Sequence, residues 1–125
     1  MATVRVKSGK VPKSKKKVIF ELKIKGELNI TAFSARQQVN YYLIVHVGNL
    51  LHAGNPDLVV GDEGSTRWNV PVIYSLPGRG TLGTVGHICV DAQNGDLKFK
   101  ASTSKEELRA NAKRLYQQAA SQARA

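Results

Sequence analysis

Apolar and polar residues alternate most regularly between residues 67 and 76. One parity holds Trp68, Val70, Val72, Tyr74 and Leu76, and the other holds Arg67, Asn69 and Ser75. A period of two predicts a strand with one packed face and one hydrated face. Pro71 falls on the polar parity and cannot donate to a sheet ladder, so we expect a sheet edge or a bulge at that point.

Two further strand patterns follow, at residues 84–91 and at Leu97–Phe99. A glycine-rich loop, Pro77–Gly83, makes the first connection, and Asn94-Gly95 makes the second. An Asn-Gly pair between alternating apolar residues favours a type I′ hairpin turn, because both central residues of that turn have positive φ. Strands joined by tight turns pair antiparallel, so this region predicts a meander.

Upstream of the meander the apolar period changes to three or four residues. This spacing predicts a helix over Ala32–Ala53 with one apolar stripe. Thr31 is a suitable N-cap, whereas Gly54 and Pro56 are residues that end helices.

A second helix is expected near the end of the chain. Ser104 and Glu107 form an Ser-x-x-Glu capping box, and apolar residues follow at helical spacing. Shorter alternations predict further strands at Thr3–Lys7, Val18–Ile24 and Asp57–Gly61.

These elements predict an α+β protein, in which an antiparallel meander sheet of four to five strands packs on one long helix, with a C-terminal helix after it. We expect one domain over residues 18–125, preceded by a basic flexible arm over residues 1–17. Of the aromatic residues, Tyr41 lies beside the helix stripe and is a candidate interface anchor. We assign the following four to the core: Phe33, Trp68, Tyr74 and Phe99.

Charge is distributed unevenly along the chain, which carries a formal net charge of +10. Residues 1–25 hold nine lysines and arginines and one glutamate, so most of the positive charge belongs to the arm. Such asymmetry favours contact with a polyanion, although a solubilising tail would have the same composition. The candidate contacts are Lys13, Lys15, Lys16 and Lys17, together with Arg79 in the glycine-rich loop. That loop lacks the Gly-Lys-Ser/Thr of a phosphate-binding loop, so we interpret it as a long, mobile hairpin connection.

Cysteine usage and hydropathy bear on the location of the protein. The single cysteine, Cys89, excludes an intramolecular disulfide and fits a reducing compartment. No apolar run is long enough for a membrane span, and no secretory signal pattern follows the lysine-rich start. We therefore expect a cytoplasmic protein.

His87, Cys89 and Asp91 share one parity of a predicted strand and are the most suggestive group for chemistry. Three such side chains could ligate a metal or pair a thiol with a base. The structural alternative, which we favour, is that Asp91 begins the turn and Cys89 is a small filler. His46 and His52 are six residues apart, which is not the spacing of a two-ligand helix face, and we interpret them as partly exposed helix residues.

The segments Trp68–Val72 and Val85–Leu97 resemble the PepSY-type module, whose pattern is a helix followed by a meander that ends in a V-D-A-x-T-G-x-V-like hairpin. Val90–Leu97 matches that hairpin, with Asn94 in place of threonine. The resemblance covers roughly residues 31–100 and points to an uncharacterised prokaryotic relative. It implies a small non-catalytic module that binds or restrains another protein.

No Ser/His/Asp arrangement, paired-carboxylate motif or dinucleotide fingerprint occurs, so we expect neither an enzyme nor a cofactor. The leading hypothesis is a non-catalytic binding or assembly module that contacts a protein partner or forms a homo-oligomer. The first alternative is a nucleic-acid-associated protein that binds phosphates through its arm. The second is a metal- or thiol-dependent enzyme that uses the strand face of His87, Cys89 and Asp91.

Overall fold

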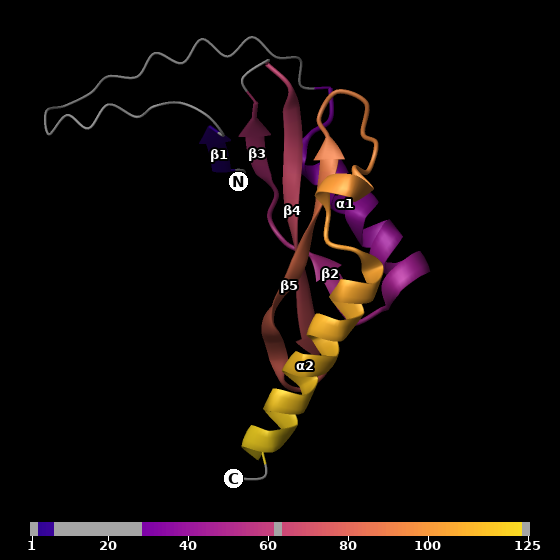
Figure 1. The fold of residues 1–125 in the computed structure, drawn as a ribbon, viewed down its shortest axis with the longest axis vertical. Helices are drawn as coiled ribbons and strands as arrows, with labels where there is room; N and C mark the ends of the chain where they lie inside the picture. Colours follow the sequence, from indigo (N-terminus) through magenta and orange to yellow (C-terminus); the bar gives the residue numbers. More distant parts are fainter. Residues whose placement is uncertain (1–2, 7–28, 62–63, 124–125) are drawn as a thin grey trace, which may run out of the picture.

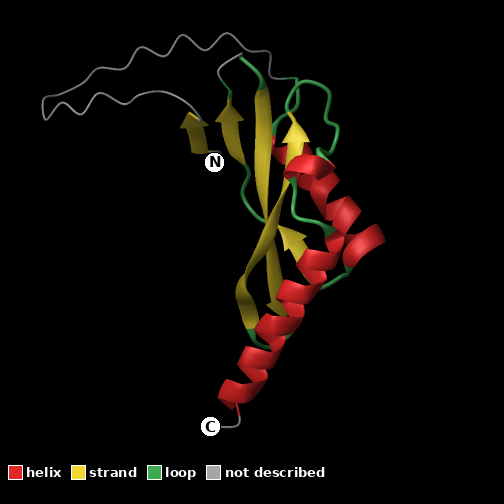
Figure 2. Ribbon diagram, in the orientation of Figure 1, coloured by secondary structure: helices red, strands yellow, loops and turns green. Residues whose placement is uncertain are grey.

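The computed structural model describes residues 3–6, 29–61 and 64–123 of the 125-residue chain. Its helices lie against one side of a twisted sheet (Figures 1 and 2). In chain order the elements are β1 (Thr3–Val6), α1 (Ala32–Tyr42), the π-helical turn η1 (Leu43–Val47), β2 (Leu51–Ala53), β3 (Asp57–Val60), β4 (Thr66–Leu76), β5 (Gly80–Asp91), the 3₁₀ turn η2 (Phe99–Ala101) and α2 (Lys105–Ala123).

β4 is the central strand of the sheet. β5 pairs antiparallel with it from Arg67 to Leu76. Along the other edge of β4, β3 pairs with residues 66–69 and β2 with residues 72–74, both antiparallel. β1 extends the sheet beyond β3 as a parallel strand. Residues 51–60 therefore follow one edge of β4 as a single, interrupted strand.

The interruption, residues 54–56, lies opposite Val70 and Pro71. The Gly54 amide donates to the Pro71 carbonyl at 2.8 Å, so the backbone nitrogen of Pro71 faces the same gap. A proline there removes no ladder hydrogen bond. The expectation of a sheet edge or a bulge at Pro71 is wrong, because β4 is the central strand and its register shifts lie between Val72 and Ile73 and between Tyr74 and Ser75. The proline is tolerated because it faces the gap between β2 and β3.

α1 and α2 pack on the sheet face that carries the apolar parity of β4. Ala35, Val39 and Leu43 of the first helical segment belong to one buried cluster with Leu108 of α2. The sheet contributes the following residues to that cluster: Leu51, Ala53, Leu58, Val60, Trp68, Val70, Val72, Tyr74, Val85, Ile88 and Val90. The structure confirms the predicted α+β class, with antiparallel pairing among β2, β3, β4 and β5 and with a C-terminal helix.

Two glycines of β5 let α2 approach the sheet closely. A Cβ atom on Gly86 would lie 2.8 Å from Leu108 Cδ2, and one on Gly83 would lie 3.2 Å from Leu115 Cδ1. Leu108 and Leu115 are two helical turns apart, so both project from the same side of α2. Each leucine thus packs directly on strand backbone.

The predicted helix over Ala32–Ala53 is too long, because helical structure ends at Val47 and Leu51–Ala53 forms β2. Leu51 continues the helical spacing, but Leu51 and Ala53 also alternate with His52 as strand residues do, and pairing with β4 decides the outcome. Asn40 and Arg36 of α1 complete the pairing of Ala53: the Asn40 Oδ1 atom accepts from its amide at 2.7 Å, and Arg36 Nε donates to its carbonyl at 3.1 Å. His52 is consequently a strand residue, not a helix residue.

The glycine-rich loop is also shorter than predicted. Only Pro77–Arg79 forms a turn, and Gly80–Gly83 belongs to β5. The Arg79 amide donates to the Leu76 carbonyl at 3.1 Å, and Gly78 has φ of 79°, so Pro-Gly forms the centre of a type II turn. The Pro77-Gly78 turn therefore connects β4 and β5 tightly.

Asn94-Gly95 does reverse the chain, but not through a type I′ turn. Gly95 alone has positive φ, 80°, and its amide donates to the Asp91 carbonyl at 2.9 Å. The predicted third strand is reduced to one antiparallel bridge, between Val90 and Leu97. Beyond it the chain leaves the ladder for η2.

Some predictions fall on parts of the chain that are only partly described. The strand expected at Thr3–Lys7 corresponds to β1, so the predicted arm contributes at least this strand to the sheet. The rest of the arm and the strand expected at Val18–Ile24 lie outside the described residues. Within the described residues, neither helix combines the length and apolar character needed to cross a bilayer.

Candidate protein-binding surface

β5 brings His87, Cys89 and Asp91 to one face, and all three bond to the segment that follows the hairpin. His87 Nε2 lies 3.1 Å from the Ala101 carbonyl oxygen, and the Cys89 thiol donates to the same oxygen at 3.4 Å. The Asp91 carboxylate lies 3.5 Å from Lys98 Nζ. These contacts hold the segment against β5, which agrees with the structural interpretation of the three residues.

Asp91 also closes the hairpin, as the sequence suggested. Its Oδ1 atom accepts hydrogen bonds from the amides of Gln93 (2.8 Å) and Asn94 (3.3 Å). The Gln93 amide is the main cause that lowers the pKa of the Asp91 carboxyl below its ordinary value. Partial burial opposes this effect, while the Asn94 amide and Lys98 lower the pKa further.

No metal centre is apparent in the part of the chain that the structure describes, where no three His, Cys, Asp or Glu side chains gather suitably. His46 lies exposed in η1 and His52 half-buried in β2.

The predicted contact residues are separated from one another. Arg79 lies exposed in the β4–β5 turn, where its Nη1 atom donates to the Ala119 carbonyl near the end of α2 at 3.1 Å. Its guanidinium thus already links two parts of this chain. Lys13, Lys15, Lys16 and Lys17 lie outside the described residues.

A large apolar surface lies instead on the side of α1 and η1 that faces away from the sheet. Four side chains there are exposed: Phe33 (68%), Tyr41 (70%), Ile44 (64%) and Val45 (53%). We call these four residues the outer face. Because Ala35, Val39 and Leu43 fill the core from the other side, this helical segment is apolar on two sides. Helices of that kind are normally covered on both sides.

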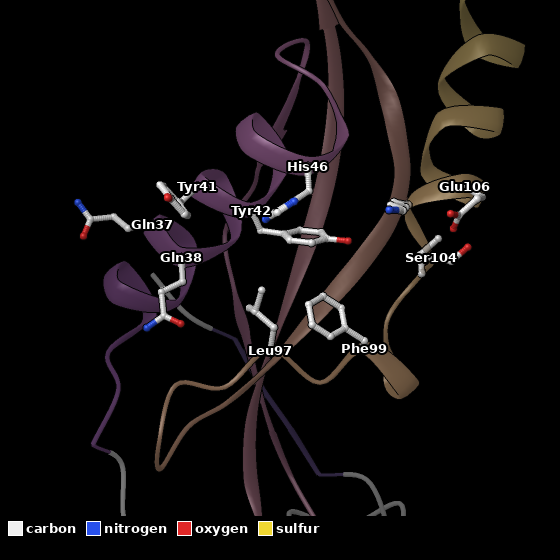
Figure 3. Close-up of a pocket in the computed structure, with 11 residues that line it drawn as sticks. Gln37, Gln38, Tyr41, Tyr42, His46, Leu97, Phe99, Ser104 and Glu106 are labelled. Atoms are coloured by element: carbon white, nitrogen blue, oxygen red, sulfur yellow. The ribbon is translucent and has the colours of Figure 1, made fainter.

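A groove of about 820 Å³ adjoins the outer face between α1 and the start of α2. Figure 3 shows the Tyr42 ring between His46 and Phe99, with Leu97 below it and Ser104 across the groove. The Tyr42 ring centroid lies 5.4 Å from that of His46 and 5.3 Å from that of Phe99. The rings form a continuous aromatic wall.

The far end of the first helical segment is fixed by α2. Arg109 donates from Nε to the Val47 carbonyl at 3.2 Å and from Nη2 to the His46 carbonyl at 2.9 Å. A guanidinium at a helix C-terminus satisfies carbonyls that lack helical partners and complements the helix dipole. The two walls of the groove are therefore held in a defined position.

A second hollow, of about 650 Å³, lies on the other side of the Leu97–Ala101 segment. Arg67, Lys98 and Lys100 line it, with Asp91 as the one carboxylate among the lining residues that the structure describes. The described part of the lining therefore carries more positive than negative charge.

Comparison of the chain with protein-family models, with curated proteins and with solved structures gave no match. The resemblance to PepSY-type modules stays a prediction.

Two of the four core assignments made for aromatic residues are wrong. Phe33 belongs to the exposed outer face, and Phe99 is 57% exposed at the rim of the groove. Trp68 and Tyr74 are buried as predicted, and Tyr41 is exposed as suggested for an interface anchor. The sequence did contain a signal for the outer face, because Phe33, Tyr41 and Ile44 share one side of the helix, opposite Ala35, Val39 and Leu43.

Proposed function

We propose that this protein is a non-catalytic binding and assembly module that contacts another protein chain through the outer face of α1 and η1. The observation that carries the proposal is the exposure of Phe33, Tyr41, Ile44 and Val45 on a helical segment whose opposite side already fills the core. Exposed large apolar side chains that gather on one side of a helix are typical of interaction surfaces.

The neighbouring groove supports the same function. Tyr41 borders both the outer face and the groove, and tyrosine combines a large apolar ring with a hydroxyl that suits interface anchors. The aromatic wall of Tyr42 and Phe99 offers apolar area to side chains of a partner. Binding of a partner at the outer face requires no chemical reaction. We therefore keep the hypothesis of a non-catalytic module.

Site-specific photo-crosslinking tests the proposal. A benzophenone amino acid at position 41 should form adducts with protein, and Ile44→Glu in the same chain should abolish them. The matched control places the benzophenone at Tyr116, a tyrosine that is exposed on α2. Absence of protein adducts at position 41, or adducts that persist with Ile44→Glu, would contradict the proposal.

A second candidate function is binding of a polyanion such as nucleic acid, which the charge of residues 1–25 favours. The basic hollow of Arg67, Lys98 and Lys100 adds positive charge among the described residues. Binding to a labelled oligonucleotide should then fall steeply with salt and should weaken when residues 1–17 are deleted. A flat titration at low salt would rule this candidate out.

We propose no reaction at His87, Cys89 and Asp91, because each side chain already contacts the segment after the hairpin. A cytoplasmic location remains our proposal, supported by the single cysteine, which is buried beneath that segment.

A further inference from the structure

The outer face forms a straight stripe along one helical segment. Phe33, Gln37, Tyr41 and Ile44 follow one another at spacings of four, four and three residues, with Val45 beside them, and all are exposed. Residues at these spacings lie on one side of a helix. The 11 residues of α1 and the 5 of η1 together extend about 24 Å.

This stripe has no charged side chain, although the chain as a whole carries +10. Arg36 is the one lysine, arginine, aspartate or glutamate between residues 32 and 47. Its guanidinium is directed to β2, where it donates to the Ala53 carbonyl and, at 3.4 Å, to Asn55 Oδ1. A partner that binds through charged groups has no charged side chain to contact on this stripe. Two copies of a strongly basic chain, by contrast, can pack at this stripe without bringing like charges together.

From these observations we infer that a second copy of this chain covers the outer face, with the two α1 helices antiparallel across a two-fold axis. This inference rests on the proposed function and names its partner. In a two-fold contact the same patch serves both copies, so the patch must complement itself. An uncharged apolar stripe meets that requirement.

The order of residues along the stripe favours the antiparallel arrangement. When the axis passes between Gln37 and Tyr41, Phe33 of each copy faces Ile44 and Val45 of the other. Gln37 then lies opposite Tyr41, where an amide and a phenol hydroxyl can form a hydrogen bond. A parallel arrangement would instead place Gln37 against Gln37.

The dimer is expected to dissociate on dilution. A standard stable interface buries roughly 800 Å² on each partner, which a single helix face about 24 Å long does not reach. Association should therefore be visible at high protein concentration and lost at low concentration.

Sedimentation velocity on the full chain between about 5 and 500 μM tests the association, a range chosen for a weak interface. The wild-type chain should shift from one to two copies across this range, and Ile44→Glu should remain a monomer. Gln118→Glu introduces the same charge at an exposed site on α2 and should dimerise like the wild type. Circular dichroism of each variant establishes that the fold is intact.

A charge-pairing experiment tests the register. Phe33→Glu and Val45→Lys should each be monomeric alone, because the new charge would be buried against apolar side chains. An equimolar mixture should form a heterodimer, since the antiparallel register pairs the new glutamate with the new lysine. A mixture that stays monomeric while the wild type dimerises would overturn the antiparallel register.

The failure of this inference differs from the failure of the proposed function. A wild-type chain that stays monomeric at the highest concentration overturns the second copy as occupant. If position 41 then crosslinks a different protein, the proposed function stands without the dimer. If it crosslinks residues 7–28 of the same chain, both the dimer and the proposed function fail.

Discussion

The Asp91 carboxylate reverses the chain by accepting hydrogen bonds from the amides of Gln93 and Asn94, while its other oxygen pairs with Lys98. Each partner lies within seven residues in the sequence. An aspartate that begins a turn is a local feature, so its role could be predicted from the residues that follow it. The contacts of His87 and Cys89 with Ala101 could not, because they depend on where the later segment lies.

We expect Asp91→Ala to lower the free energy of unfolding by about 1 kcal/mol at pH 7, because two backbone amides lose a charged acceptor. The folded pKa of Asp91 lies below its ordinary value, so the stabilisation is present above the unfolded pKa and is lost as the pH falls through the folded pKa. Urea denaturation should accordingly show a gap between wild type and variant at pH 7 that closes below about pH 4.

Asp96→Ala is the matched control, since Asp96 is an exposed carboxylate of the same hairpin. It should leave stability within about 0.5 kcal/mol of the wild type. A gap for Asp91→Ala that widens on acidification would contradict the role assigned to its carboxylate.

At the scale of elements, glycines in β5 allow α2 to lie close to the sheet. A Cβ atom on Gly86 would lie 2.6 Å from Thr103 Oγ1 and 2.8 Å from Leu108 Cδ2. Neither neighbour can move away easily, because Leu108 is fully buried and Thr103 exchanges hydrogen bonds with the backbone of His87. The amphipathic pattern of α2 was visible in the sequence, but its close contact with these glycines was not.

Gly86→Ala should therefore destabilise the protein by about 1–3 kcal/mol, as overpacking in a core does. Gly48→Ala is a suitable comparison, since a Cβ atom there would meet nothing within 4 Å, and φ is 171°. Chemical denaturation of the two variants should separate them clearly. Equal stabilities would show that α2 does not need the close approach.

The end of α1 was predicted wrongly at this scale for a physical reason. Leu51 continues the helical spacing of the preceding residues, but it also alternates with His52 and Ala53 as a strand residue does. The choice is made by pairing with Tyr74 and Val72 of β4, and by Asn40, which accepts the Ala53 amide. These partners are distant in sequence or lie on another element, so the local spacing of apolar residues does not reveal them.

At the scale of the whole molecule, association through the uncharged outer face should make the stability of the fold depend on protein concentration. If two folded copies associate and unfolded chains do not, the dimer stabilises the folded state by mass action. The apparent melting temperature of the wild type should then rise by a few degrees between about 5 and 500 μM, whereas that of Ile44→Glu should stay constant. Calorimetry at the two concentrations provides the measurement, and a constant wild-type value would contradict the dimer.

The sequence by itself determined the α+β class, the packed parity of β4 and the chain reversal at Asp91. Each of these depends on periodicity or turn chemistry within a few residues. Only the tertiary structure decided which side of the first helix meets the sheet, because both sides of that helix carry apolar residues. Burial of Ala35, Val39 and Leu43 left Phe33, Tyr41, Ile44 and Val45 outside, and that choice created the surface on which the proposed function depends.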